Sequence, residues 1–447
     1  MQPTIISISR FLFPYLLVSI FLNVTIGYSQ TTAIPDSNFE QALIDLNIDT
    51  NGLNGNILNS DATAVYYLNV SQNFIHDLSG IEAFGNLKTL DCSLNNLTSL
   101  DVSQNKKLYA LNADDNQLSN INLSLNTKLK TVFLNSNLLS TLDVGSNLLL
   151  QELGVSLNNL SELVVGNNLS LQYLSCYSNN ISTIDISNNC QLSTLHIGVN
   201  GLNALDVSQN PNLHTLTCQE NNLPELSIIA NSQLNYLDCR DNNISNLDMS
   251  NNSQLERLFI SNNNLNEIDL SAASNLKLFY AINNNLTTLD ISYSSQLRWI
   301  KCDDNNLSLV DFRNGNNSHI SEFRMQQNSS LSCIFVDDSE ASFLANWIID
   351  DTCSFVENEY DCEALSLKDH ALSGIGMYPN PAFDTVTFTI NTNSANLELY
   401  TINGQLVYLK TLKLGANNID LTSLSSGLYL ARVSSGQALE TKKLLVK

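Results

Sequence analysis

Aspartate recurs at a fixed position of this sequence. In steps that are multiples of 21 residues, the same position carries Asp101, Asp143, Asp185, Asp206, Asp248, Asp269, Asp290 and Asp311. If each step adds one layer to a stacked fold, these carboxylates form a column that repels itself unless donors or cations compensate the charge. A serine often follows two residues later, as Ser103 follows Asp101. We therefore predict that the column caps hydroxyl and backbone groups, with calcium binding as the alternative.

A second group of oxygen-bearing side chains lies near the N-terminus, in the stretch DTNGLNGNILNSD. Asp49, Asn51 and Asp61 in this stretch have the arrangement of a calcium-binding loop that contains one residue too many. We predict a plain turn here, with calcium binding as the alternative. From the sequence we expect no cofactor.

Aromatic and basic residues occupy the positions that vary most between steps. Those singled out as ligand-binding candidates are Phe133, Tyr173, Tyr236, Arg257, Phe259, Tyr280, Trp299 and Lys301. From Tyr236 to Lys301 they fall on consecutive steps, and aromatic residues interleaved with cations are enriched at binding hot spots. The alternative is that these rings only cover a sheet and stack on one another.

Residues for catalysis are scarce. The chain has five histidines, and His196 precedes an inward position by one residue, so its side chain is expected to point outward, away from the buried cysteines. The sequence contains no HExxH, GxSxG, phosphate-loop or CxxC motif. We therefore predict that the protein is not an enzyme and has no catalytic residues.

The elements that must position these side chains follow a period of 21 residues. Leucine stands at positions 87, 108, 129, 150, 171, 192, 213, 234, 255, 276 and 297, and asparagine follows each of them by eight residues. The unit reads LxxLxCxxNxLxxLDVSxNxx, in which each half alternates inward apolar residues as a short strand requires and then turns at asparagine. One such coil cannot bury its apolar face alone, so the coils must stack.

This unit resembles the bacterial leucine-rich repeat family, in its 21-residue form, from about Val65 to Phe323. The resemblance implies a β-rich solenoid of about twelve coils with two short strands per coil, over residues 64–324. Five cysteines, Cys92, Cys176, Cys218, Cys239 and Cys302, stand at one inward position, where we expect small buried residues with free thiols.

Composition and the first residues indicate export. Asp and Glu number 43 against 20 Lys and Arg, which argues against binding to nucleic acid or to an anionic membrane. Residues 1–29 combine Arg10, an apolar run from Phe11 to Val24 and small residues, as a secretory signal peptide does. The alternative, a retained anchor helix, requires a longer apolar run, so we expect no membrane span in the mature protein.

Segments on both sides of the repeats are predicted to cover the open ends of the stack. Within residues 30–63, a helix is predicted to start with Asp36 or Ser37 as its N-cap. This segment resembles the N-terminal cap of leucine-rich repeat proteins from Bacteroidetes. Residues 325–364 resemble the matching C-terminal cap. That resemblance implies a disulfide between Cys333 and Cys362, although Cys353 is a possible replacement for either partner.

After a linker at residues 365–375, residues 376–447 alternate apolar and polar side chains between Gly and Asn turns, as a small β-sandwich does. They resemble the C-terminal sorting domain of type IX secretion substrates in Bacteroidetes. The residues that carry the resemblance are Tyr378, Pro379, Asn380, Pro381, Gly404, Gly427, Tyr429, Lys442 and Lys443. The resemblance implies passage through the outer membrane by the type IX machinery, followed by release or attachment at the cell surface.

The sequence therefore predicts an exported or surface-displayed binding protein that acts in protein interaction or adhesion. The expected ligand is an extracellular protein, because repeat arrays offer long surfaces rather than deep pockets. A glycan ligand is the first alternative, since rows of Tyr and Trp also suit sugars. A structural spacer without a ligand is the second.

Overall fold

The computed structural model describes residues 30–363 and 374–447, except residue 437. The predicted signal peptide and most of the predicted linker lie outside the described residues. The described chain forms two compact units, one ending at Asn147 and the other beginning at Leu148. No helix within the described ranges is long and apolar enough to cross a membrane.

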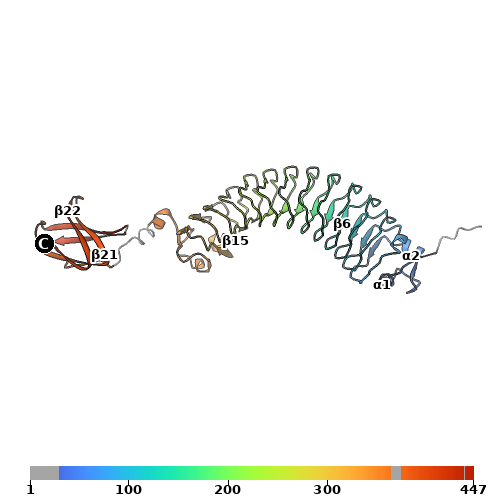
Figure 1. Cartoon of the computed structure of the whole chain (residues 1–447), viewed down its shortest axis with the longest axis horizontal. Helices are drawn as coiled ribbons and strands as arrows, with labels where there is room; N and C mark the ends of the chain where they lie inside the picture. Colours follow the sequence, from blue (N-terminus) through green and yellow to red (C-terminus); the bar gives the residue numbers. More distant parts are fainter. Residues whose placement is uncertain (1–29, 364–373, 437) are drawn as a thin grey trace, which may run out of the picture. The chain divides into compact units, whose positions relative to one another are not determined.

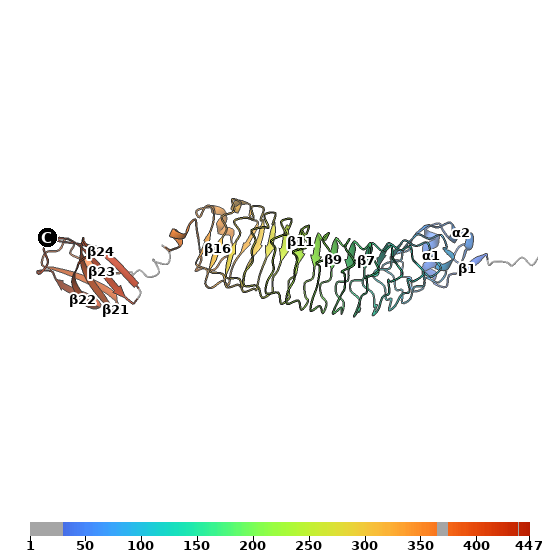
Figure 2. The same ribbon diagram turned by 90° about the horizontal axis from the view of Figure 1, so that it is seen from above.

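The first unit begins with the N-terminal cap (Figures 1 and 2). Its strands β1 (Thr31–Ala33) and β2 (Asn56–Leu58) pair in antiparallel fashion, and its helices are α1 (Ser37–Asp45) and α2 (Asn59–Thr63). Asp36 caps α1, because one carboxylate oxygen accepts the backbone N–H groups of Asn38 and Phe39. The other oxygen accepts N–H groups from His76 and Asp77, and thereby ties the cap to the first coil.

Each coil of the first unit contributes one three-residue strand to a parallel sheet. These strands are β3 (Tyr67–Asn69), β4 (Thr89–Asp91), β5 (Ala110–Asn112) and β6 (Thr131–Phe133), with the short 3-10 helix η1 (Ile81–Ala83) in the first coil. Residues 21 apart are register partners, as in Thr89 and Ala110. The middle residue of each strand is buried, so the apolar side chains stack inside the coils.

The second unit continues the same arrangement through nine strands of the first half of the coil. They are β7 (Glu152–Gly154), β8 (Tyr173–Ser175), β9 (Thr194–His196), β10 (Thr215–Thr217), β11 (Tyr236–Asp238), β12 (Arg257–Phe259), β13 (Leu278–Tyr280), β15 (Trp299–Lys301) and β17 (Glu322–Arg324). Figure 2 shows these strands side by side along the coils. The predicted fold class, a leucine-rich repeat solenoid followed by a small β domain, is confirmed.

The second half of the coil departs from the expectation of a strand in every coil. Among the described coils it is a regular strand only at β14 (Thr288–Asp290) and β16 (Leu309–Asp311), which lead to β18 (Cys333–Phe335) and β19 (Ser354–Val356). At the start of this half, a backbone N–H donates to an asparagine side chain of the next coil, as Leu223 donates to Asn242 over 3.0 Å. Leu286 makes the same bond to Asn305 just before β14, so this bond is present whether or not a regular strand follows it.

Two rows of buried asparagines hold successive coils together. In one row, Asn242 also donates from Nδ2 to the carbonyls of Cys218, Cys239 and Arg240. The residue before each of these asparagines is in the left-handed region, as is Asp241 at φ 55°, so the turn orients the amide inward. In the other row, Asn252 donates to the carbonyls of Ile228 and Asn231. Both rows donate to buried backbone carbonyls of the preceding coil and so connect neighbouring coils.

The C-terminal cap closes the last coil with aromatic rings and a disulfide. The Trp347 ring stacks on Phe323 with 4.0 Å between centroids, and Phe312 packs edge-on against both. Cys333 and Cys362 form the disulfide, while Cys353 is a buried free thiol. Two short 3-10 helices, η2 (Asn317–His319) and η3 (Ser342–Asn346), fill the turns.

The last domain is a five-stranded antiparallel sheet with its own core. Its strands are β20 (Gly376–Tyr378), β21 (Thr385–Thr401), β22 (Leu406–Asp420), β23 (Gly427–Ser435) and β24 (Ala438–Val446). The register of β21 against β22 shifts between Ile390 and Ser394. The five strands are connected by antiparallel pairing, and Phe388, Leu399 and Leu444 are buried in the core of the domain.

Candidate binding surface on strands β11 to β17

The strand-face patch consists of Tyr236, Arg257, Phe259, Tyr280, Trp299 and Lys301. Because the strands are parallel and in register, the first outward position forms one row, from Tyr236 through Arg257 and Leu278 to Trp299. The second outward position forms another row, from Phe259 through Tyr280 to Lys301. The structure therefore brings all six predicted residues onto one face of the sheet.

Three of the rings contact one another across the strands. Tyr236 and Phe259 have centroids 5.5 Å apart, and Phe259 meets Tyr280 edge-to-face at 5.4 Å. Burial raises the pKa of both tyrosine hydroxyls. This packing is worth about 0.5–1.5 kcal/mol per pair beyond area burial and fixes the ring orientations. Trp299 and Arg257 stay exposed at the outer positions, so the patch has a rigid centre and an accessible edge.

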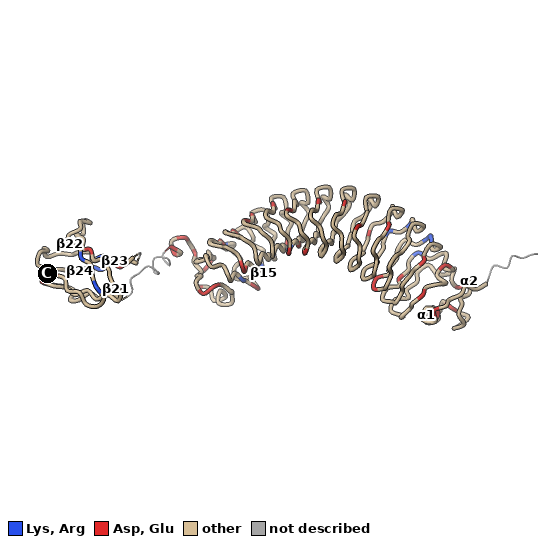
Figure 3. The backbone as a smooth tube through the Cα atoms, viewed as in Figure 1, with Lys and Arg blue, Asp and Glu red and all other residues tan. Residues whose placement is uncertain are grey.

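Each cation that covers a ring also binds a carboxylate. The Arg240 guanidinium lies over Phe259 at 5.3 Å and binds Asp238 with two nitrogens. Lys301 lies 4.8 Å from the centroid of Tyr280 and 2.9 Å from a carboxylate oxygen of Glu322. Figure 3 shows basic residues beside β15, while acidic residues are spread along the coils. The patch therefore combines apolar rings with paired charges of both signs.

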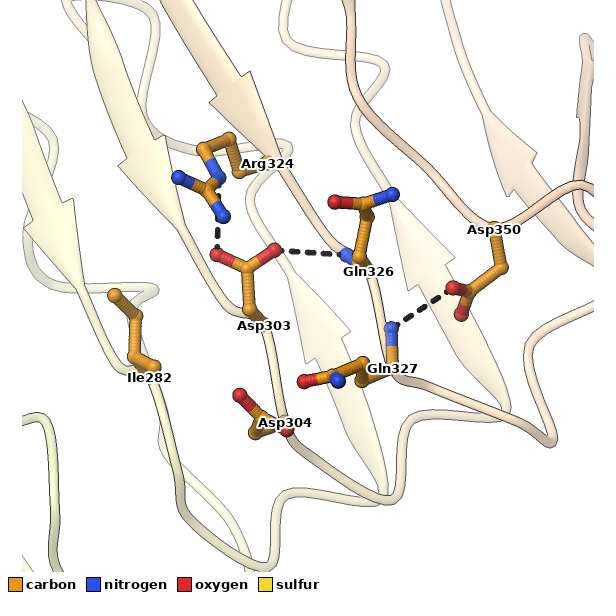
Figure 4. A pocket seen from close by; sticks show the side chains of 7 residues that line it. All are labelled: Ile282, Asp303, Asp304, Arg324, Gln326, Gln327 and Asp350. Atoms are coloured by element: carbon orange, nitrogen blue, oxygen red, sulfur yellow. Dashed lines mark hydrogen bonds and ion pairs between the residues drawn. The ribbon is translucent and has the colours of Figure 1, made fainter.

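A polar pocket of about 310 Å³ lies at the end of the second row (Figure 4). Asp303 is buried in its wall, where one oxygen accepts the backbone N–H of Gln326 at 3.0 Å. The other oxygen lies 3.3 Å from Arg324 Nε, which is within ion-pair distance but lacks the angle of a hydrogen bond. Asp350 accepts the N–H groups of Gln327 and Asn328 and so fixes the opposite wall.

Sequence reasoning missed three side chains of this surface. Arg324 is the register partner of Lys301 and extends the second row, but the step between them is 23 residues instead of 21. Asp303 and Arg240 occupy an outward position after the strand that the repeat comparison did not include. Arg324 can be identified from the sequence if the last coil is allowed to contain two additional residues.

Phe133 and Tyr173 do not belong to the strand-face patch. Phe133 is on β6 in the first unit. Tyr173 is on β8, where its ring packs edge-on against His196 with centroids 5.8 Å apart. A ring nitrogen of His196 lies 2.9 Å from the Thr217 hydroxyl, and burial lowers the pKa of this histidine. Tyr173, His196 and Thr217 form a separate, smaller contact.

Reactive groups for catalysis do not converge in the described part of the chain. Burial raises the pKa of the inward cysteines, to about 12 for Cys176, so their thiols are poor nucleophiles near neutral pH. Within residues 30–363 and 374–447, no three His, Cys, Asp or Glu side chains are arranged to hold a metal ion. The aspartate column caps its own turns, because each of the eight carboxylates accepts the N–H two residues later.

The predicted sorting-domain residues lie in turns and on strands β20, β23 and β24 of the last domain. Asn380 clamps the terminal strand β24, donating to the carbonyl of Lys443 at 2.7 Å and accepting from the N–H of Leu445 at 2.9 Å. Tyr429 donates to the carbonyl of Ser425. Gly404 has a φ of 80°, which suits the turn between β21 and β22. These residues fix the end of the chain; Lys442 pairs with Glu440, and Tyr378 stays exposed.

Comparison with known proteins agrees with this architecture. Residues 376–447 match the family model of the secretion system C-terminal sorting domain. The functional domain of InlJ from Listeria monocytogenes, which includes a cysteine ladder, is 24% identical with a TM-score of 0.61, covering 94% of this chain and 99% of that one. The internalin InlF from Listeria monocytogenes is 22% identical with a TM-score of 0.59, covering 72% of this chain and 92% of its own. No curated protein matches the chain. At these identities the similarity establishes the fold.

Proposed function

We propose that this chain, a leucine-rich repeat protein that ends in a type IX secretion C-terminal sorting domain, is exported and binds an extracellular protein through the strand-face patch. The observation that carries the proposal is the row of three contacting rings flanked by cations on β11 to β15. The same two outward positions on β9 and β10 carry Thr194, His196, Thr215 and Thr217. Aromatic residues and arginine are the side chains enriched at protein-binding hot spots.

The packing of the patch favours a protein ligand over a glycan. A sugar stacks on the flat face of an open ring, but Phe259 meets Tyr280 edge-to-face and is covered by Arg240, and Lys301 lies over Tyr280. Paired charges of both signs suit the polar rim of a protein interface. Only Trp299 in this patch exposes a large ring surface, and that exposure keeps the glycan as the second candidate.

Export is proposed from the sorting domain together with the predicted signal peptide at residues 1–29. The mature protein is then released or displayed on the outer surface, and the type IX machinery is a transient partner during export. Expression of the chain without residues 376–447 tests this step, because the shortened protein is expected to accumulate in the periplasm. Export of the shortened protein to the medium would contradict it.

Binding is tested with the purified protein on arrays of extracellular proteins and of glycans. The test variant carries Tyr236→Ala, Phe259→Ala, Tyr280→Ala and Trp299→Ala. A matched control replaces four exposed aromatic residues of the first unit, with Tyr66→Ala, Tyr67→Ala, Phe74→Ala and Tyr109→Ala. Circular dichroism melts check that both variants fold.

The proposal expects protein binding that the control retains and the test variant loses. If the protein binds only glycans and the test variant loses this binding, the patch is a glycan-binding surface. Binding that the test variant retains would place the site elsewhere. No binding by the unmodified protein on either array would favour the spacer.

A further inference from the structure

The N-terminal cap places a loop rich in oxygen ligands between two helices. Helix α1 ends at Asp45, and α2 begins at Asn59 after the short strand β2. Gly52 and Gly55 in the loop have φ values of 82° and 81°, in the left-handed region that sharp turns of metal-binding loops require. The backbone therefore runs in the order helix, turning loop, short strand, helix.

Two oxygens in this loop are buried without a hydrogen-bond donor. Asp49 is 5% exposed, and while its Oδ1 accepts the N–H of Asn51 at 3.1 Å, its Oδ2 has no donor. The Oδ1 of Asn51 is likewise buried without a donor, although its Nδ2 donates to Asn56 at 3.0 Å. Leaving a buried carboxylate oxygen unpaired is costly. A cation is the kind of partner that would satisfy such oxygens.

The surroundings of the loop are negative. Residues 30–63 contain five carboxylates and no Lys, Arg or His. No basic side chain of the cap compensates these charges, so a bound cation would relieve their repulsion.

Other hydrogen bonds hold the loop in place independently of a cation. Glu40 is 2% exposed, and its Oε1 accepts the N–H groups of Asn54, Gly55 and Asn56 at 2.8, 2.7 and 3.1 Å. Asp61 Oδ2 accepts from the N–H and hydroxyl of Thr50 and brings the end of the loop back to its start. The ligands are therefore preorganised, and little order has to be created on binding.

We propose that the loop from Asp49 to Asp61 binds one calcium ion through Asp49, Asn51 and Asp61, with water completing the coordination shell. Calcium fits because it accepts a mixed set of carboxylate and amide oxygens in flexible geometry, whereas magnesium demands a near-ideal octahedron. Two carboxylates and one amide give the site a small total ligand charge. The affinity therefore falls in the class of extracellular modules, with a Kd on the order of 10⁻⁴–10⁻³ M.

The test is calcium titration of the full chain after removal of metal with a chelator, followed by calorimetry and by the melting temperature of the cap. Asp49→Asn is the main variant, because asparagine keeps the shape and the acceptor for the Asn51 N–H but removes the charge. Asp61→Asn removes the second carboxylate. Asp45→Asn is the matched control, since this exposed residue at the end of α1 undergoes the same change of charge. Melts in chelator verify that each variant folds.

The proposal expects saturable calcium binding with one site, weakened at least ~10-fold by Asp49→Asn and by Asp61→Asn and unchanged by Asp45→Asn. Absence of a calcium-dependent heat or melting shift in the unmodified protein would overturn it. Equal weakening by the control would show nonspecific attraction to an acidic surface. Displacement of calcium by an equal concentration of magnesium would also refute the assignment.

Discussion

The two rows of buried asparagines differ in one respect that predicts unequal effects of the same substitution. Asn242 both accepts and donates, because its Oδ1 takes the N–H of Leu223 while its Nδ2 donates to three carbonyls. Asn252 only donates, and its Oδ1 is buried without a donor. Replacing each with alanine removes the same atoms from a buried site.

The loss of stability in Asn242→Ala depends on which of the bonded backbone groups keep another hydrogen-bond partner. Without Asn242, the Cys218 carbonyl still accepts from Asn221 and the Cys239 carbonyl still accepts from Asn263. The buried N–H of Leu223 donates to Asn242 alone, and leaving it unpaired costs about 1–3 kcal/mol.

Asn252→Ala leaves no backbone group of its hydrogen bonds without a partner. The carbonyls of Ile228 and Asn231 retain the backbone N–H groups of Asn231 and Leu234. The substitution also removes an unpaired oxygen, so we expect Asn242→Ala to destabilise its coil by about 1 to 3 kcal/mol more than Asn252→Ala.

Amide hydrogen exchange measured by mass spectrometry on peptides within residues 213–263 is the suitable assay, because repeat proteins open locally and a single global free energy can hide the difference. Urea denaturation followed by circular dichroism supplies a second measure. Equal loss of protection in the two variants, or a larger loss in Asn252→Ala, would refute the reasoning from unpaired groups.

Three further predictions follow from cysteines and carboxylates. Cys333 and Cys362 are 29 residues apart, and in the chain-entropy model reducing their disulfide should lower the stability of the C-terminal cap by about 3 to 4 kcal/mol. Thermal denaturation with and without reductant would detect this loss. An unchanged melting temperature would contradict the prediction. In the native protein, Ellman's reagent should modify the exposed Cys190 much faster than Cys176, whose pKa is raised to about 12 by burial; similar rates would be inconsistent with a closed core. The N–H of Ser250 lowers the pKa of Asp248 below its usual 3.8, so this carboxylate contributes stability above the unfolded pKa that is lost as pH falls through the folded pKa. Asp248→Asn should therefore reduce the loss of stability between about pH 5 and about pH 3 in urea titrations, and an unchanged acid sensitivity would argue against the capping role.

The repeat frame predicted the fold because it fixes both the inward positions and the register. Each step of 21 residues places equivalent residues on neighbouring strands, so the partnership of Phe259 with Tyr280 follows from counting alone. The frame could not predict the second half of the coil, which forms a regular strand at β14 and β16 and an irregular extended segment in the coils before them. That choice depends on the geometry of the turn, which the apolar pattern does not specify.

The composition of the candidate surface was predictable, but its contacts were not. Counting places Tyr280 and Lys301 side by side, and it cannot tell whether the lysine points to solvent or folds over the ring onto Glu322. Long side chains choose between such positions by local packing and charge. Arg324 was likewise not predicted, because the spacing from Lys301 is 23 residues and an insertion shifts every later residue out of the 21-residue frame.

The position of the strand-face patch next to the C-terminal cap has a physical reason. A row of rings presents a defined surface only if the strands beneath it do not open, and coils near an uncovered end of a stack open most easily. Here the cap holds the strand that follows the patch, because Met325 donates to the carbonyl of Ile348 and Asp350 accepts from Gln327 and Asn328. Trp347 stacks on Phe323 inside the same coil. The cap thus stabilises β17, and β17 pairs with β15, so the rings and cations rest on coils that are closed from both sides.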